Sequence, residues 1–179
     1  MESRGSPTLR PATLDDKAEL TTLIARSARE LSASDYTPAQ IEGALLGAFG
    51  IDTQLILDGT YFVAEADGKI VACGGWSKRR TLFGGDARSG RDAAELDPAT
   101  DAAKIRAFFV DPAYARRGLG SAILERCESE ARAQGFRHFE MMATLPGAKL
   151  YTRYGYSGTE RIQYEVQPGV LIDFIPMRK

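Results

Sequence analysis

Hydrophobic and polar positions repeat with two different periods along the chain, and the change of period separates expected strands from expected helices. Runs rich in β-branched and aromatic residues, which are typical of strands, lie at residues 8–13, 60–66, 69–77, 105–110, 162–166 and 170–177. Apolar residues recur at helical spacing along residues 17–30, 38–49 and 122–134. The pattern therefore predicts a chain that mixes helices and strands.

Capping and turn residues mark where these elements begin and end. Asp15 and Asp16 can cap the first helix, and Pro38 suits the first turn of the second, where its missing N–H is not needed. Asp67-Gly68 joins two strands as a hairpin, and Pro168-Gly169 joins the last two strands in the same antiparallel way.

The connection between the strands at 69–77 and 105–110 is long, charged and rich in glycine. Its 87–101 part predicts a flexible loop or hairpin insertion within a single domain that spans residues 1–179. Gly74 and Gly75 lie in the preceding strand, where they allow either a bulge or the close approach of a ligand.

Residues 104–135 combine a strand, a glycine loop and a helix. Asp111-Pro112 stops the strand, because proline lacks a ladder donor, and Gly135 suits the end of the helix. The helix start at residues 118–121 presents unpaired backbone N–H groups and a positive dipole end, with Arg116-Arg117 beside it. Such a start can bind a phosphate or diphosphate, although a tight turn with solvated arginines fits the same spacing.

Two common nucleotide-binding motifs do not fit this loop. No Gly-Lys-Ser or Gly-Lys-Thr follows the glycines, so a lysine for a γ-phosphate and a hydroxyl for magnesium are both missing. A Rossmann fingerprint would need a third glycine at position 123, which is Ile123.

The segment Val110-Asp111-Pro112, followed by residues 114–124, resembles the acyl-CoA-binding motif of the GNAT superfamily of N-acetyltransferases. That motif reads (Gln/Arg)-x-x-Gly-x-(Gly/Ala) and follows a strand. Gly118 and Gly120 fit it, whereas Ala115 stands at its first position and the two arginines come one and two places later.

A second stretch, Leu150 to Tyr156, resembles the late family motif (Leu/Phe)-Tyr-x-x-x-Gly-Phe, with Tyr156 in place of the usual phenylalanine. The elements expected between the motifs, a strand at 137–143 and a short helix, have the spacing of the family. The resemblance covers residues 104–156 by motif and residues 8–178 by order of elements.

The resemblance implies an α/β fold in which helices flank a mixed, largely antiparallel central sheet. The strands at 105–110 and 138–143 would splay apart in a V, and acetyl-CoA would lie in the opening. Pantetheine would pair with the first strand and the diphosphate would meet the glycine loop. The implied cofactor-binding residues are Phe109, Val110, Ala115, Arg116, Arg117, Gly118, Leu119, Gly120, Ser121 and Tyr154.

The same resemblance assigns catalytic roles. Tyr151 matches the family tyrosine that protonates the departing CoA thiolate, and a phenol with a pKa of about 10 can do so at neutral pH. Tyr154 is the backup, and either tyrosine could instead be a packing aromatic. Glu140 is a candidate general base; a water chain, or an amine that arrives neutral, would replace it. Asp111 is a poorer base, because Asp-Pro at a strand end usually shapes the turn.

Two aromatic residues are candidates for the acceptor side of the cleft. Tyr36 lies in the loop between the first two helices, which line the acceptor site in the resembled family. Trp76, the only tryptophan, could form a wall of the acceptor pocket. Each has a plainer alternative, since Tyr36 could pack its loop and Trp76 could belong to the core.

Composition excludes several other functions. A net charge of −1 gives no field that favours nucleic acid or a membrane surface, so a nucleic-acid module has little support. Two separated cysteines and one histidine, His138, supply neither a zinc site nor a Ser-His-Asp triad, and no metal is expected. Cys73 and Cys127 fit buried apolar positions. The polar start lacks a secretory core, so a cytoplasmic location is expected.

These observations predict an N-acetyltransferase that moves an acetyl group from acetyl-CoA to a primary amine of a small molecule or peptide by direct transfer. The alternative is a CoA- or metabolite-binding module on the same fold without catalysis. No membrane or nucleic-acid partner is expected, and a homodimer is compatible with the sequence. The residues do not name the acceptor amine.

Overall fold

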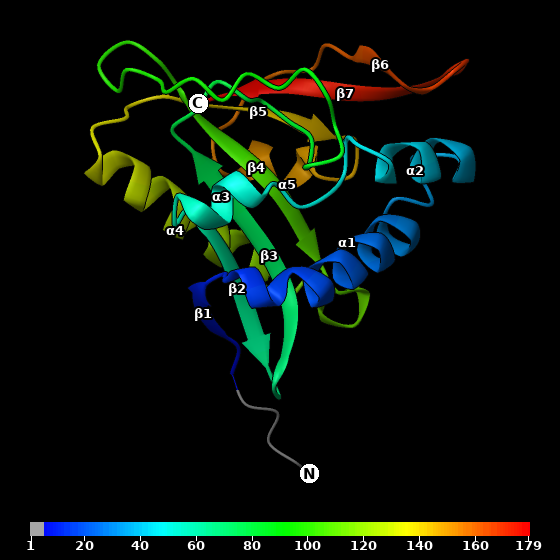
Figure 1. Cartoon of the computed structure of the whole chain (residues 1–179), viewed down its shortest axis with the longest axis horizontal. Helices are drawn as coiled ribbons and strands as arrows, with labels where there is room; N and C mark the ends of the chain where they lie inside the picture. The colour runs from blue at the N-terminus through cyan, green and yellow to red at the C-terminus, as the bar shows by residue number, and fades with distance from the viewer. Residues whose placement is uncertain (1–5) are drawn as a thin grey trace.

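A seven-stranded mixed sheet forms the centre of the computed structural model (Figure 1). The structure describes residues 6–179, so the expectation of a start without a secretory core falls partly on residues 1–5, outside the described residues. The strands are β1 (Thr8–Pro11), β2 (Tyr61–Ala66), β3 (Lys69–Ser77), β4 (Ala103–Val110), β5 (Phe139–Thr144), β6 (Ile162–Gln167) and β7 (Val170–Arg178).

The strand order is β1-β2-β3-β4-β5-β7-β6, and every neighbouring pair is antiparallel except β4 with β5. Both expected hairpins form, one at Asp67-Gly68 and one at Pro168-Gly169. Gly68 and Gly169 have φ values of 73° and 77°, a backbone region that glycine adopts without steric cost. The predicted mixed, largely antiparallel sheet is therefore confirmed.

Helices cover both faces of the sheet. They are α1 (Lys17–Leu31), α2 (Pro38–Leu45), α3 (Thr53–Leu57), α4 (Leu119–Ala133) and α5 (Ala148–Arg153), and Figure 1 shows α1 and α3 in front of the sheet with α4 behind it. One core contains apolar residues of α1, α2 and α3, and the other contains those of α4 and α5. Among the helices of residues 6–179, none has the length and apolar character needed to cross a membrane.

The ends of the first two helices differ in part from the prediction. Pro38 does open α2, with Thr37 and Gln40 forming a capping box before and after it. Asp16 precedes α1 but makes no capping bond to it, because its carboxylate instead pairs with Arg10 at 2.8 Å. The expected 38–49 helix ends at Leu45, since the chain turns back and buries Phe49.

One helix was not foreseen. In α3, five residues follow Asp52, whose carboxylate accepts the backbone N–H of Gln54 at 3.0 Å and so caps the helix. Leu55 and Ile56 are buried against the sheet. A helix of this length is too short to show a helical period in the sequence.

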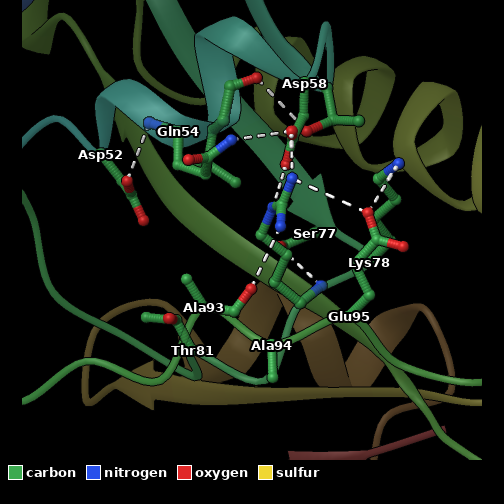
Figure 2. Close-up of polar contacts among 12 residues, drawn as sticks. Asp52, Gln54, Asp58, Ser77, Lys78, Thr81, Ala93, Ala94 and Glu95 are labelled. Carbon is green, nitrogen blue, oxygen red and sulfur yellow. Dashed lines mark hydrogen bonds and ion pairs between the residues drawn. The ribbon is translucent and has the colours of Figure 1, made fainter.

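The long connection between β3 and β4 folds as a hairpin-like insertion. Arg79 and Glu95 form an isolated antiparallel bridge, and backbone bonds join Arg80 N–H to Ala94 O at 2.9 Å and Leu96 N–H to the carbonyl of residue 78 at 2.8 Å. The Arg79 side chain pairs at 2.7 Å with Asp58, the residue that follows the last turn of α3. Figure 2 shows Asp58 on one side of this junction and Lys78 and Glu95 on the other. The insertion is thus fixed to α3 at its base.

Candidate active site

The splay between β4 and β5 is the central feature of the site. The two parallel strands pair only at their first residues, Ala103 with Phe139 and Lys104 with Glu140, and Figure 1 shows them diverging beyond that point. A cavity of about 70 Å³ lies in the opening, and we call it the splay cavity. Its walls come from residues 105–109 of β4, from Met141, Met142 and Thr144 of β5, and from Tyr151 of α5.

A β-bulge bends β4 beside this cavity. The register with β3 shifts between Cys73 and Gly75, and Ala107 has a φ of 54°, which is uncommon for a residue with a Cβ. The Ala107 carbonyl accepts the Tyr61 hydroxyl at 3.0 Å. A Cβ on Gly74 would lie 2.9 Å from the Phe108 ring. Gly74 and Gly75 therefore lie at a β-bulge, as the first of the two predicted explanations proposed.

The glycine loop after β4 forms as the sequence suggests. The Asp111 carboxylate accepts the Ala113 N–H at 2.8 Å and starts a short 3₁₀ turn at Pro112–Tyr114. Arg116 and Gly118 then adopt positive φ values of 59° and 80°, and α4 begins at Leu119. In the described part of the chain, no side chain caps this helix start. Its N–H groups and positive dipole end are available to an anion.

The predicted cofactor-binding residues surround this helix start. Arg116, Arg117 and Gly118 are exposed, Leu119 is buried, and Ala115, Gly120 and Ser121 are half-buried. The Arg117 guanidinium lies 5.0 Å from the centre of the Tyr114 ring, with which it makes a cation–π contact. A Cβ on Gly120 would approach Leu150 to 3.2 Å, so the first turn of α4 and the start of α5 are neighbours.

Phe109 and Val110 lie at the end of β4, as expected. The Val110 N–H donates to Ser27 Oγ of α1 at 3.3 Å, so this backbone donor already has a partner. The Phe109 side chain packs edge-on against Phe49 at a centroid distance of 5.9 Å and lines the splay cavity.

Tyr151 lies at the wall of the splay cavity and is 8% exposed. Its ring packs edge-on against Phe108 at 6.1 Å and Tyr156 at 5.9 Å. Within residues 6–179 its hydroxyl makes no hydrogen bond to another group of the protein. Burial raises the pKa of this phenol above its usual value. The side chain is therefore a protonated phenol held rigidly at the cavity.

Tyr154 lies outside the splay cavity. Its hydroxyl donates to Glu125 of α4 at 3.2 Å, and its ring packs at the edge of the core that α4 covers. Of the two tyrosines considered as a proton donor, the structure brings only Tyr151 to the cavity.

The comparisons with known proteins agree with this geometry. The sequence model of the Acetyltransferase (GNAT) family matches residues 24–156, which is more than half of the chain. The chain belongs to the GNAT acetyltransferase family. No sequence among the curated proteins matched it.

Solved structures of GNAT proteins share its fold. A GCN5-related N-acetyltransferase from Rhodopseudomonas palustris is 20% identical with a TM-score of 0.71, covering 100% of this chain and 98% of that one. PaiA N-acetyltransferase from Thermoplasma acidophilum, in complex with coenzyme A, is 14% identical with a TM-score of 0.66 and coverages of 98% and 99%. A GNAT acetyltransferase from Brucella melitensis, in complex with acetyl-CoA, is 17% identical with a TM-score of 0.55 and coverages of 85% and 83%.

In this GNAT chain Glu140 lies at the closed end of the V. Its carboxylate forms one ion pair with Lys104, directly opposite on β4, and a second with Arg178 Nε of β7 at 3.4 Å. Glu140 is not among the residues that line the splay cavity. The structure therefore does not bring the candidate base together with Tyr151, and its contacts fit the structural role of a paired carboxylate.

The two aromatic residues predicted for the acceptor side are both buried. The Tyr36 hydroxyl donates to Asp173 O of β7 at 2.7 Å and accepts the Leu145 N–H at 2.9 Å, and burial raises its pKa to about 12. Trp76 is 0% exposed and packs on Phe136 in the core beneath α4. Neither lines the splay cavity, so these placements favour the packing alternative for both.

Sequence analysis missed the insertion and Arg106 as parts of the site. Phe83 and Gly84 line the splay cavity together with Phe49 and Arg106. Arg106 is 3% exposed and donates to Gly84 O at 2.7 Å and to Asp52 at 3.1 Å. The position of Arg106 within the apolar run 105–110 could have indicated this role, because a buried charge needs partners from elsewhere in the chain.

Proposed function

We propose that this GNAT protein is an N-acetyltransferase that moves an acetyl group from acetyl-CoA to a primary amine by direct transfer. The observation that carries the proposal is an uncapped, glycine-started helix whose first turn adjoins Leu150, the neighbour in α5 of the buried tyrosine at the wall of the splay cavity. The complexes of similar structures with coenzyme A and acetyl-CoA support this choice of acyl donor.

The diphosphate of CoA binds at the start of α4. Backbone N–H groups of Gly118, Leu119, Gly120 and Ser121 can donate to its oxygens, and the positive dipole end attracts its charge. Arg116 and Arg117 add positive charge at the exposed mouth of the loop. Ala115 contributes its extended backbone rather than a functional side chain.

The pantetheine arm runs from this loop along β4 into the splay cavity. The edge of β4 beyond Lys104 has no strand paired to it on the β5 side, so its backbone can pair with an amide of the arm. The Val110 N–H already donates to Ser27 Oγ. An amide of the pantetheine arm therefore pairs with the Val110 carbonyl, or it displaces the serine hydroxyl from the Val110 N–H. The arm places the thioester beside Tyr151.

Chemistry requires three bond changes at the thioester. The neutral amine attacks the acetyl carbonyl and forms the C–N bond, and the C–S bond then breaks to release the CoA thiolate. Tyr151 gives its phenolic proton to that sulfur, a role for which its raised pKa keeps it protonated at neutral pH. The proton lost by the amine leaves to solvent water, because Glu140 is occupied by Lys104 and Arg178, and the Tyr151 phenolate takes a proton back from solvent to complete the cycle.

A thiol-release assay with acetyl-CoA across a panel of primary amines tests the proposal. Thiol release should depend on both the protein and the amine, and acetyl-CoA should raise Tm more than pantetheine, which lacks the diphosphate. If acetyl-CoA raises Tm but no amine accelerates thiol release, the protein is a CoA-binding module without catalysis. Equal Tm shifts from acetyl-CoA and pantetheine would contradict the diphosphate site.

A further inference from the structure

A second cavity of about 300 Å³ shares Arg106 with the splay cavity. It lies among α3, the end of β3 and the insertion, and Figure 2 shows part of its surroundings. Its lining includes Asp52, Thr81 and four arginines, Arg79, Arg88, Arg91 and Arg106. We call it the arginine cavity, because among the described residues that line it four guanidinium groups accompany one carboxylate.

One carboxylate oxygen serves two of these arginines. Asp52 Oδ2 lies 3.1 Å from Arg106 and 2.8 Å from Arg91, while Asp52 Oδ1 accepts the Gln54 N–H at 3.0 Å. The side chains of Arg106 and Asp52 are 2% and 4% exposed, so this charge cluster is removed from water. Arg91, whose side chain is 22% exposed, also lies 3.8 Å from Asp86, so the buried Asp52 carboxylate is shared between Arg106 and a partly exposed arginine that has a second, more distant partner.

The third arginine is neutralised separately. Arg79 forms a two-pronged pair with Asp58, at 2.7 Å through Nε and 2.9 Å through a terminal nitrogen. Figure 2 shows Asp58 at the top of the view, apart from Asp52, and Glu95 below it beside Lys78. The hydrogen bonds that Arg79 donates to Asp58 raise the pKa of Arg79, as expected for a matched pair. This arginine therefore forms part of the wall and carries no unmatched charge.

Arg88 has no carboxylate within ion-pair distance in the described part of the chain. One terminal nitrogen donates to Phe83 O at 2.9 Å, and the guanidinium lies 4.0 Å from the centre of the Phe83 ring. Its Nε is buried and makes no hydrogen bond to the described residues. A buried donor without a partner is costly, so this guanidinium is prepared for an acceptor that the chain itself does not provide.

Burial of excess positive charge is itself unfavourable. Desolvation lowers the pKa of Arg106, even though Asp52 acts in the opposite direction. An anion in the cavity would offset this cost. The planar fork of a guanidinium matches the two oxygens of a carboxylate, with which it can form paired, charge-assisted hydrogen bonds.

We propose that the arginine cavity binds a carboxylate carried by the amine acceptor, with Arg88 as its principal partner and Arg91 and Arg106 beside it. The acceptor class is then an amine that also bears a carboxylate, such as an amino acid or an acidic peptide. Its amine reaches the splay cavity past Arg106, the residue that the two cavities share. This inference rests on the proposed function, but the cavity can be tested without catalysis.

Matched acceptors test the preference. Amino acids and the corresponding amino-acid amides exchange a carboxylate for a neutral carboxamide, which also lowers the pKa of the α-amine. Expressed per neutral amine, kcat/KM should therefore favour the acids by roughly 10- to 100-fold, the range for hydrogen bonds to a charged partner. The Arg88→Gln variant should lose most of this preference, and Arg88→Lys should restore only part of it, since lysine keeps the charge but not the fork. Arg137→Gln, at an exposed position outside both cavities, makes the same change of net charge and should retain the preference.

Direct binding separates this inference from the proposed function. Glutarate should raise Tm by about 3 °C or more once its concentration exceeds its Kd tenfold, whereas the neutral glutaramide should not, at constant ionic strength. The shift should be lost in Arg88→Gln and kept in Arg137→Gln. If glutarate binds in this way but no amine is acetylated, the site stands and the proposed function fails. Equal shifts from glutarate and inorganic phosphate, or no shift from either, would overturn the carboxylate assignment, as would equal kcat/KM for acids and amides.

Discussion

The Tyr151→Phe substitution tests the proposed proton donor with little disturbance of the fold. It removes one oxygen and keeps the ring that packs edge-on against Phe108 and Tyr156. Because no hydrogen bond from this hydroxyl is found within residues 6–179, its loss leaves no buried partner unsatisfied. The free energy of unfolding should therefore change by no more than about 0.5 kcal/mol.

The effect on catalysis should be much larger. Loss of a general acid lowers kcat by about 10²- to 10⁴-fold, which corresponds to about 2.7–5.4 kcal/mol of transition-state stabilisation. The Kd for acetyl-CoA should hardly change, because the hydroxyl acts only when the thiolate departs. The measurements are kcat by thiol release, Kd by calorimetry and stability by urea denaturation.

Tyr156→Phe is the matched control, since it removes the same atom from a neighbouring ring. The Tyr156 hydroxyl donates to buried Glu128 at 2.8 Å, and a hydrogen bond to a charged group contributes about 1.5–3 kcal/mol. The free energy of unfolding of this variant should fall by about 1.5–3 kcal/mol, and Tm should fall by roughly 2–4 °C for each kcal/mol, while kcat stays nearly unchanged. The two variants thus have opposite signatures. Near wild-type kcat in Tyr151→Phe, or an equal loss of kcat in both, would refute the assignment.

Three further predictions follow from the same contacts. Gly120→Glu should abolish acetyl-CoA binding in calorimetry while the far-UV circular dichroism spectrum stays unchanged. Gly120→Ala should still bind acetyl-CoA, because its Cβ would meet only the end of the Leu150 side chain. Unchanged affinity in Gly120→Glu would show that the loop is only a turn and does not bind the diphosphate. Tyr36→Phe should lower the free energy of unfolding by about 1–3 kcal/mol in urea denaturation, because the half-buried Leu145 N–H loses its acceptor. A change below about 0.5 kcal/mol would show that this bridge does not stabilise the fold. Because burial raises the pKa of Tyr151, the phenol stays protonated at neutral pH, and its ionisation should not lower wild-type kcat until the pH exceeds about 10. The Tyr151→Phe variant should lack this decrease at high pH. A decrease of kcat near pH 8 that Tyr151→Phe abolishes would contradict the raised pKa.

Local signals in the sequence were sufficient for much of the fold and for the acyl-donor side of the site. Gly118 and Gly68 need positive φ angles, and each marks an element boundary that depends only on nearby residues. The parting of β4 from β5 was expected from a motif rather than from periodicity, and the register confirms it. Tyr151 could be placed at the cavity because it falls in such a motif.

Contacts between distant segments were harder to foresee. Glu140 is paired with Lys104, 36 residues away, and this partner depends on the register of two parallel strands. Arg106 finds its partners on α3 and on the insertion, neither of which has a strong helical or strand period. Trp76 was compatible with the core and with a pocket wall, and the face of β3 on which it lies places it in the core.

Transfer of an isotope-labelled acetyl group distinguishes direct acetyl transfer to an amine from binding of acetyl-CoA without catalysis. The protein is incubated with labelled acetyl-CoA and a panel of primary amines, and the products and the intact protein are analysed by mass spectrometry. The account predicts labelled amide on an amine, no labelled acetyl on the protein, and no product with Gly120→Glu. Stable binding of acetyl-CoA with no labelled amine across the panel, or a labelled acetyl-protein that forms and decays before product appears, would contradict direct transfer.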